Sequence, residues 1–195
     1  MEYRLSQEQL MDILAIWNRF LKRKIHLIAC GGTALTLQGI KSTTKDVDFM
    51  VPIETEYEYL IKVLKDLGYQ LRTGAGWKTP NDPYIFDLYR GKKIHTTELF
   101  ESPLKEGRHK LIKEWQHLYV GVLNHYDLII SKIFRASSAD VEDCLMLYQA
   151  KKEEIDFDEL EGRYKESAKY HEPENRMLDN WEHFKRILKK FPLKK

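Results

Sequence analysis

Residues 26–51 read HLIACGGTALTLQGIKSTTKDVDFMV, and this stretch decides the fold of the chain. It begins with a short apolar run, residues 26–30, which is stopped by two glycines as a buried strand is. Good helix formers follow over residues 33–38 and end at Gly39, which predicts a short helix. The two glycines are therefore expected to join a strand to the N-terminus of a helix.

The stretch ends in a second predicted strand that carries two aspartates. Residues 46–51 alternate charged and apolar side chains until Pro52, which is typical of a strand with one polar face. Because residues two apart on a strand share a face, we expect Asp46 and Asp48 to point the same way. The apolar residues between and after them are expected to enter the core.

The sequence on either side adds helices and strands. Ser6 and Gln9 form a capping box ahead of apolar residues at helical spacing, and Thr55 and Glu58 form a second one. Further strands are predicted at residues 69–73, 84–89 and 117–123, and residues 96–113 are interpreted as a loop with at most a short strand.

The character of the chain changes after residue 123. Asn124 and Ser138 are the expected caps of two helices, and two polar helices are expected over residues 159–170 and 176–190. We therefore predict an α/β (α+β) fold, with a mixed sheet flanked by helices in residues 1–123 and a helical region in residues 124–195.

Composition excludes several classes of protein. The 195 residues are 43% hydrophobic, which is enough for a real core, and no apolar run approaches the ~20 residues that cross a bilayer. The 32 Lys and Arg and 30 Asp and Glu give a net charge of +2, which excludes a protein that binds nucleic acid over its whole surface. Any contact with nucleic acid is therefore expected at a local basic patch. Cys30 and Cys144 lack C-x-x-C spacing, so we expect two reduced, buried thiols. We expect a cytoplasmic protein without membrane contact.

The acidic residues indicate magnesium chemistry. Magnesium prefers hard oxygen ligands, often one or two carboxylates with phosphate oxygens and water. Asp46 and Asp48 meet that need, and Asp87 in YIFDLY supplies a third carboxylate on another strand, able to share a metal and to accept a proton from an attacking hydroxyl. We expect Mg²⁺ as cofactor, with Mn²⁺ as the alternative.

The glycines supply the second half of the predicted site. At Gly31 and Gly32 the absent side chains let backbone approach a phosphate, the following helix offers unpaired amides, and Thr33 adds a hydroxyl. Lys45, beside the first acid, is a further phosphate candidate, with a solvated lysine as the alternative. Each signal alone is weak, but the order strand, Gly-Gly, helix, D-x-D and third acid makes coincidence improbable.

These residues resemble a known family, the nucleotidyltransferases of the DNA polymerase β type, over roughly residues 25–90. In particular, GGTALTLQGIKSTTKDVDF resembles the AbiEii-type branch, which includes toxin-like transferases, and NHYDLIISKIFRASSADVEDCLML resembles that branch's helical segment. The resemblance implies phosphate binding by Gly31, Gly32 and Thr33, and metal binding by Asp46 and Asp48 with Asp87 as the third carboxylate.

The same resemblance places a basic residue for the nucleotide at Lys132, for which a solvated helical lysine is the alternative. Asp140 and Asp143 lie three apart on one helical face and are expected to contact Lys132 or Arg135 structurally. The histidines show no metal-binding spacing, so no catalytic histidine is expected. Trp77 is expected to pack, with stacking on a base as the alternative.

The leading functional prediction is an enzyme that moves a nucleoside monophosphate from a triphosphate to an acceptor hydroxyl. The acceptor could be an RNA end such as transfer RNA, a protein or a small molecule; the first would use a basic surface made of Arg90, Lys92, Lys93, Arg108 and Lys110. The alternatives are a non-catalytic, partner-binding module of a toxin and antitoxin pair, and a manganese-dependent glycosyltransferase. Oligomeric state is left open.

Overall fold

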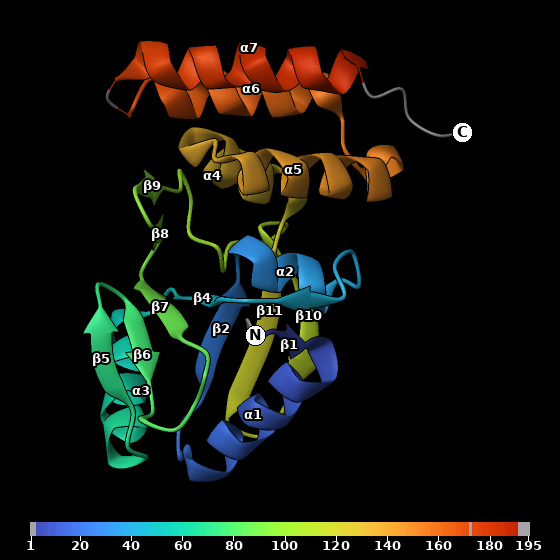
Figure 1. Cartoon of the computed structure of the whole chain (residues 1–195). Coiled ribbons are helices and arrows are strands. Elements are labelled where there is room, and N and C mark those ends of the chain that lie inside the picture. The colour runs from blue at the N-terminus through green and yellow to red at the C-terminus, as the bar shows by residue number, and fades with distance from the viewer. Residues whose placement is uncertain (1–2, 172, 191–195) are drawn as a thin grey trace. The chain divides into compact units, whose positions relative to one another are not determined.

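The computed structural model describes residues 3–171 and 173–190 (Figure 1). The chain divides into two compact units, residues 1–123 and residues 124–195. The first unit contains the β-sheet and the second is helical.

A seven-stranded mixed sheet forms the centre of the first unit. Its spatial order is β10-β11-β2-β4-β7-β6-β5, in which β11/β2 and β4/β7 are parallel pairs and the other four pairs are antiparallel. The strands are β2 (Ile25–Ala29), β4 (Val47–Val51), β5 (Gln70–Thr73), β6 (Gly76–Lys78), β7 (Phe86–Arg90), β10 (His109–Glu114) and β11 (Leu118–Leu123). The mixed sheet with flanking helices confirms the predicted fold class.

Helix α1 (Gln7–Phe20) begins at the capping box that Ser6 and Gln9 form, as the sequence predicts. Its Trp17 is buried against the ring of Phe86 on β7, with ring centroids 4.7 Å apart. The Trp17 indole N–H donates to the Tyr69 hydroxyl at 3.1 Å, so the polar atom of this large side chain is satisfied inside the core.

Helix α3 (Glu54–Asp66) follows β4, but the second predicted capping box is wrong. The helix begins at Glu54, and its N-cap is Ile53, which offers no side-chain hydrogen bond. Thr55 therefore lies inside the first turn, where Glu54 and Glu56 provide the favourable negative charge instead.

Residues 74–113 contain more strand than the sequence predicts. Strand β6 lies between the predicted strands at residues 69–73 and 84–89, where the sequence predicts none. The hairpin β8 (Lys93–Ile94) and β9 (Thr97–Glu98) follows β7, and β10 forms an edge of the sheet. All six side chains of β10 are exposed or half-buried, so its sequence lacks the alternation that reveals a strand with one buried face. Two-residue strands β1 (Leu5–Ser6) and β3 (Thr43–Thr44) pair separately.

The second unit consists of α4 (His125–Arg135), α5 (Ser138–Ala150), a 3₁₀ turn (Lys152–Glu154), α6 (Phe157–Ala168) and α7 (Glu174–Lys190). Asn124 caps α4 as expected, whereas α5 is capped by Ser137 rather than Ser138, through a capping box with Asp140. The core of the unit is aromatic, with Tyr164 stacked on Trp181 at 4.7 Å. Among the described residues, no helix is long and apolar enough to span a membrane.

Candidate active site

The parallel pairing of β4 with β7 brings two of the three predicted acids together. Asp48 is directly opposite Asp87 in the register of the two strands. Laterally paired residues present their side chains on the same face of a sheet, so both carboxylates leave the sheet on one side. The two side chains come from positions far apart in sequence, and only the strand register makes them neighbours.

Asp46 occupies a different position from the predicted one. It lies in a bend before β4 and is exposed, whereas Asp48 is only 8% exposed. Every residue of β4 is buried, so the polar face predicted for this strand is reduced to Asp48 and is covered rather than solvated. Asp46 nevertheless acts on the pair: burial raises the pKa of Asp87, and the negative charge of Asp46 raises it further.

Thr33 holds the backbone around the two acids. Its hydroxyl donates to the Asp46 carbonyl at 3.1 Å and accepts from the Asp48 N–H at 2.9 Å, and the side chain is fully buried. Thr44 donates to the same Asp46 carbonyl at 2.7 Å. The Thr33 hydroxyl therefore fixes the D-x-D segment, and its contact with a phosphate stays a prediction.

Gly31 is required by the position of Asp48. Helix α2 (Gly31–Leu37) begins at the glycines, which are its first two residues rather than a linker before it. A Cβ built at Gly31 would lie 2.3 Å from Oδ2 of Asp48, and the φ angle of +56° is one that glycine favours. At Gly32 the corresponding Cβ would lie 3.0 Å from Thr44 Oγ1. Both glycines thus permit close packing of the acid-bearing segment against α2.

Two residues beside the acids were not predicted from the sequence. Tyr89 follows Asp87 by two positions on β7, so it shares the face of the carboxylates, and its hydroxyl donates to Asp48 Oδ1 at 3.3 Å. The Tyr89 oxygen also lies 2.8 Å from Nε2 of His95, which is 3.9 Å from Asp48 Oδ1. Because alternate residues of a strand share a face, the position of Tyr89 two residues after Asp87 could have predicted that it lies beside the acids. No local signal marks His95, which the β8–β9 turn brings back at a φ of +50°.

The chemistry of this donor set fits a hard divalent cation. Burial and the Asp48 and Asp87 charges raise the pKa of Tyr89, so its hydroxyl stays protonated and remains a hydrogen-bond donor. The paired carboxylates repel each other and Asp46, an arrangement that a cation would relieve. In the described part of the chain, no group of three or more His, Cys, Asp and Glu side chains is arranged to hold a metal, so the three aspartates are not a closed ligand set.

Comparison with known proteins identifies the family of the chain. The sequence matches the family described as "Nucleotidyltransferase of unknown function (DUF6036)" over residues 8–189. The chain belongs to this nucleotidyltransferase family. A comparison with curated proteins finds no match.

A solved structure shares the fold of this nucleotidyltransferase. The crystal structure of ANT(2")-Ia in complex with adenylyl-2"-tobramycin matches with a TM-score of 0.56 and 16% identity, covering 85% of this chain and 98% of that one. A Thermotoga maritima protein with a provisional nucleotidyltransferase assignment gives a TM-score of 0.46 and 13% identity, covering 77% and 98% respectively.

Lys45 and Lys132 are the two basic residues predicted to contact the nucleotide. Lys45 is exposed in the bend beside Asp46. Lys132, in the second unit, is only 3% exposed, and its ammonium lies 2.8 Å from Asp143 and 3.7 Å from Asp140. Two buried carboxylates hold the Lys132 ammonium, so the structure does not show it available to a nucleotide as expected. The predicted structural contacts of Asp140 and Asp143 are confirmed.

The expected basic surface is largely neutralised. Arg90 pairs with Glu54 and Glu58, Lys92 with Glu98, and Arg108 with Glu101. The surface spanning residues 90–110 therefore carries much less positive charge than its sequence predicts. Trp77 is buried, with the Lys65 ammonium 5.7 Å from its ring centroid, which confirms packing rather than base stacking.

Replacing Gly31 tests the close approach of Asp48. Gly31→Ala is expected to destabilise the protein by about 1–2 kcal/mol through its positive φ and by about 1–3 kcal/mol more through the clash with Asp48. Gly39→Ala is the matched control, because Gly39 also has a positive φ but a Cβ there meets nothing within 4 Å. Urea unfolding measures both free energies. Equal losses would contradict the contact between Gly31 and Asp48.

The buried charges around Lys132 predict a pH dependence of stability. Burial acts to raise the pKa of Asp140, but hydrogen bonds from Arg135 and Ser137 outweigh it and lower the pKa from 3.8 to about 2. The contribution of ionised Asp140 is therefore complete above about pH 4 and is lost as the pH falls toward 2. The free energy of unfolding of wild type relative to Asp140→Asn should shrink over this range. If the difference in the free energy of unfolding between wild type and Asp140→Asn instead stayed constant as the pH fell from 4 to 2, the stabilising role of ionised Asp140 would be refuted.

Proposed function

We propose that this nucleotidyltransferase moves a nucleoside monophosphate from a nucleoside triphosphate to an acceptor hydroxyl, with Asp48 and Asp87 as the central acids. The observation that supports it most is the register of β4 against β7, which sets these two carboxylates side by side. Family membership supports the reaction class, and the register supports the choice of residues.

We propose Mg²⁺ as the cofactor, with Mn²⁺ as the alternative, because carboxylate oxygens suit both ions. Asp48 and Asp87 would hold the metal, with Asp46 as the third acid, whose charge already acts on Asp87. Magnesium binds commonly through one or two carboxylates, completed by substrate phosphates and water, so a closed protein ligand set is unnecessary. When bound, the cation supplies neutralisation of charge on the triphosphate.

Each residue then has a task in the transfer. The acceptor oxygen attacks the α-phosphorus and forms the new P–O bond, while the bond from that phosphorus to the oxygen bridging to the β-phosphate breaks and pyrophosphate leaves. Asp87 is the proposed acceptor of the hydroxyl proton, a role favoured by a carboxylate whose pKa is raised. Gly31, Gly32 and Lys45 are proposed phosphate contacts, since glycine lets a phosphate approach the backbone at the start of α2 and Lys45 is exposed beside Asp46.

Tyr89 and His95 are proposed as positioning residues. The Tyr89 hydroxyl donates to one oxygen of Asp48, which leaves the other oxygen beside Gly31. His95 contacts the Tyr89 oxygen and so fixes the direction of the hydroxyl. A carboxylate held on two sides keeps its orientation when a charged substrate binds, which reduces the reorganisation needed for transfer.

The biological role is proposed from the sequence resemblance. The segment GGTALTLQGIKSTTKDVDF supports an AbiEii-like assignment and hence a toxin-like role with a partner protein. All three acids are present, which favours catalysis over the alternative of a non-catalytic module. The ANT(2")-Ia structure contains an adenylylated small molecule; for this chain RNA, a protein and a small molecule are the proposed acceptor classes.

Loss of either central acid should abolish transfer. Asp48→Asn and Asp87→Asn keep side-chain size but remove a negative charge, so each should lower transfer at least about 100-fold through lost electrostatic stabilisation. Labelled triphosphates are incubated with Mg²⁺, total RNA, cell protein and a metabolite extract, followed by gel and thin-layer separation. The control is Asp12→Asn, an exposed carboxylate on α1. Full activity of both site variants would exclude these residues as the catalytic acids.

Tyr89→Phe tests the positioning role. The lost hydrogen bond should reduce kcat about 3- to 10-fold, corresponding to about 0.5–1.5 kcal/mol, and leave KM for the triphosphate nearly unchanged. Steady-state kinetics separate the two constants, and thermal unfolding shows whether the fold is retained. An increased KM with wild-type kcat would instead indicate that Tyr89 contributes to substrate binding alone.

A further inference from the structure

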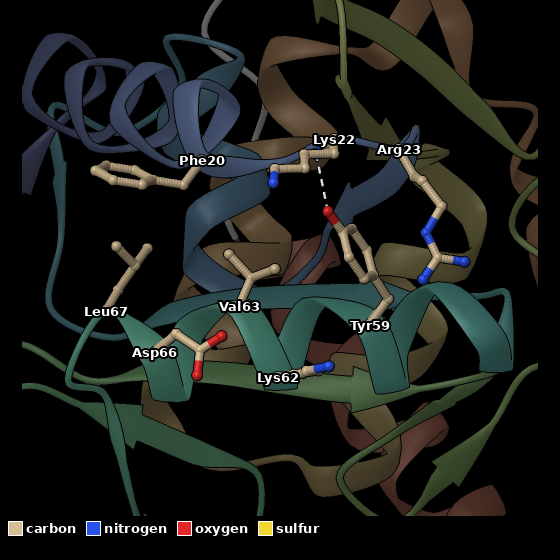
Figure 2. A pocket seen from close by; sticks show the side chains of 8 residues that line it. All are labelled: Phe20, Lys22, Arg23, Tyr59, Lys62, Val63, Asp66 and Leu67. Carbon is tan, nitrogen blue, oxygen red and sulfur yellow. Dashed lines mark hydrogen bonds between the residues drawn. The ribbon is translucent and has the colours of Figure 1, made fainter.

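The first unit contains a pocket lined by residues at and just after the end of α1 and by residues of α3 and its C-terminus (Figure 2). Its volume is about 310 Å³, close to the lower limit of pockets that accept a small molecule or one unit of a polymer. Its lining residues are Phe20, Lys22, Arg23, Tyr59, Lys62, Val63, Asp66 and Leu67.

The pocket is positively charged, and its cations are accessible to solvent. Lys22, Arg23 and Lys62 are exposed and face one carboxylate, Asp66. Within residues 3–171 and 173–190, none of these three cations forms an ion pair with a carboxylate. This distinguishes the pocket from the surface around residues 90–110, whose arginines are paired with glutamates.

The aromatic residues of the pocket are arranged for stacking. The Arg23 guanidinium lies over the Tyr59 ring, 4.3 Å from its centroid, and the Tyr59 hydroxyl accepts from the Lys22 N–H at 2.8 Å (Figure 2). These contacts fix Tyr59 and the guanidinium beside it. Phe20 is 52% exposed, so a large apolar ring is presented to solvent at the edge of the cationic group. Exposed rings next to cations are the usual elements of single-strand binding.

The pocket lies away from the proposed active site. Lys22 and Arg23 precede the first residue of β2, while Cys30, just after its last residue, donates its N–H to the Asp48 carbonyl. The five residues of β2 thus separate the two places, roughly 16 Å at 3.3 Å per residue. A ligand in this pocket is therefore not the reacting triphosphate.

We propose that this pocket binds single-stranded nucleic acid, with backbone phosphates on Lys22, Arg23 and Lys62 and a base stacked on Phe20. Lys22, Arg23 and Lys62 outnumber the one carboxylate of the pocket, so they match the repeated negative charge of a phosphate backbone. The exposed ring of Phe20 can stack on a base, which every nucleotide carries. The same charges would repel a polyamine or another cationic small molecule. This proposal goes beyond the proposed function and does not depend on it.

Fluorescence anisotropy with a labelled 12-nucleotide RNA of mixed sequence tests the proposal on the full chain. EDTA is present and triphosphate is absent, so binding is measured independently of transfer. Three phosphate contacts predict a slope of about −2 for log Kobs against log salt concentration. Lys62→Ala should weaken binding and bring the slope about 0.7 closer to zero. Phe20→Ala should weaken binding about 5- to 100-fold, as expected for one lost stacked base, with little change of slope.

Two controls make the result specific. Lys113→Ala removes an exposed cation on β10 and should leave binding unchanged, and Asp48→Asn should bind RNA at least as well as wild type. Retained binding by Asp48→Asn with lost transfer would separate this proposal from the proposed function. The proposal is overturned if no RNA binds at low salt, if Lys62→Ala and Lys113→Ala weaken binding equally, or if polyglutamate displaces RNA as effectively as unlabelled RNA does.

Discussion

The parallel register between β4 and β7 is the constraint on which the site depends. It places Asp48 opposite Asp87 on one face of the sheet, whereas a slip of one residue would turn one carboxylate to the other face. The apolar neighbours of the two acids are fully buried and hold this register, because Phe49 and Phe86 cannot leave the core without a large loss of apolar burial. The packing that holds the sheet together therefore also sets the positions of the two acids.

The surroundings of Asp48 explain how a nearly buried carboxylate keeps a defined orientation. Gly31 leaves space on one side, the Tyr89 hydroxyl donates on the other, and Thr33 fixes the backbone N–H of Asp48 itself. In the second unit, buried carboxylates are instead neutralised by Lys132 and Arg135. The contrast is chemical: carboxylates paired with Lys132 and Arg135 stabilise a fold, whereas two carboxylates set side by side on one face of a sheet are suited to binding a metal ion.

Sequence patterns predicted the elements whose signals are local. The Gly-Gly, the D-x-D and the capping box at Ser6 identified α2, β4 and α1, and residues 84–89 identified β7 with Asp87. Features that depend on tertiary contacts were not accessible: the bend at Asp46, the inward role of the Thr33 hydroxyl, and the return of His95 through a hairpin. Charge was also misjudged at Arg90, because its glutamate partners come from another element.

The most direct test of the central claim is metal binding by the paired acids. Electron paramagnetic resonance can count Mn²⁺ bound to the wild-type protein with a non-hydrolysable triphosphate, and to Asp48→Asn, Asp87→Asn and the exposed control Asp12→Asn. The account predicts tight Mn²⁺ binding by wild type and the control, and at least about tenfold weaker binding by each site variant, as mutation of a metal ligand or its support produces. Undiminished binding by both site variants would contradict it, because the carboxylates that the β4–β7 register brings together would then not hold the metal.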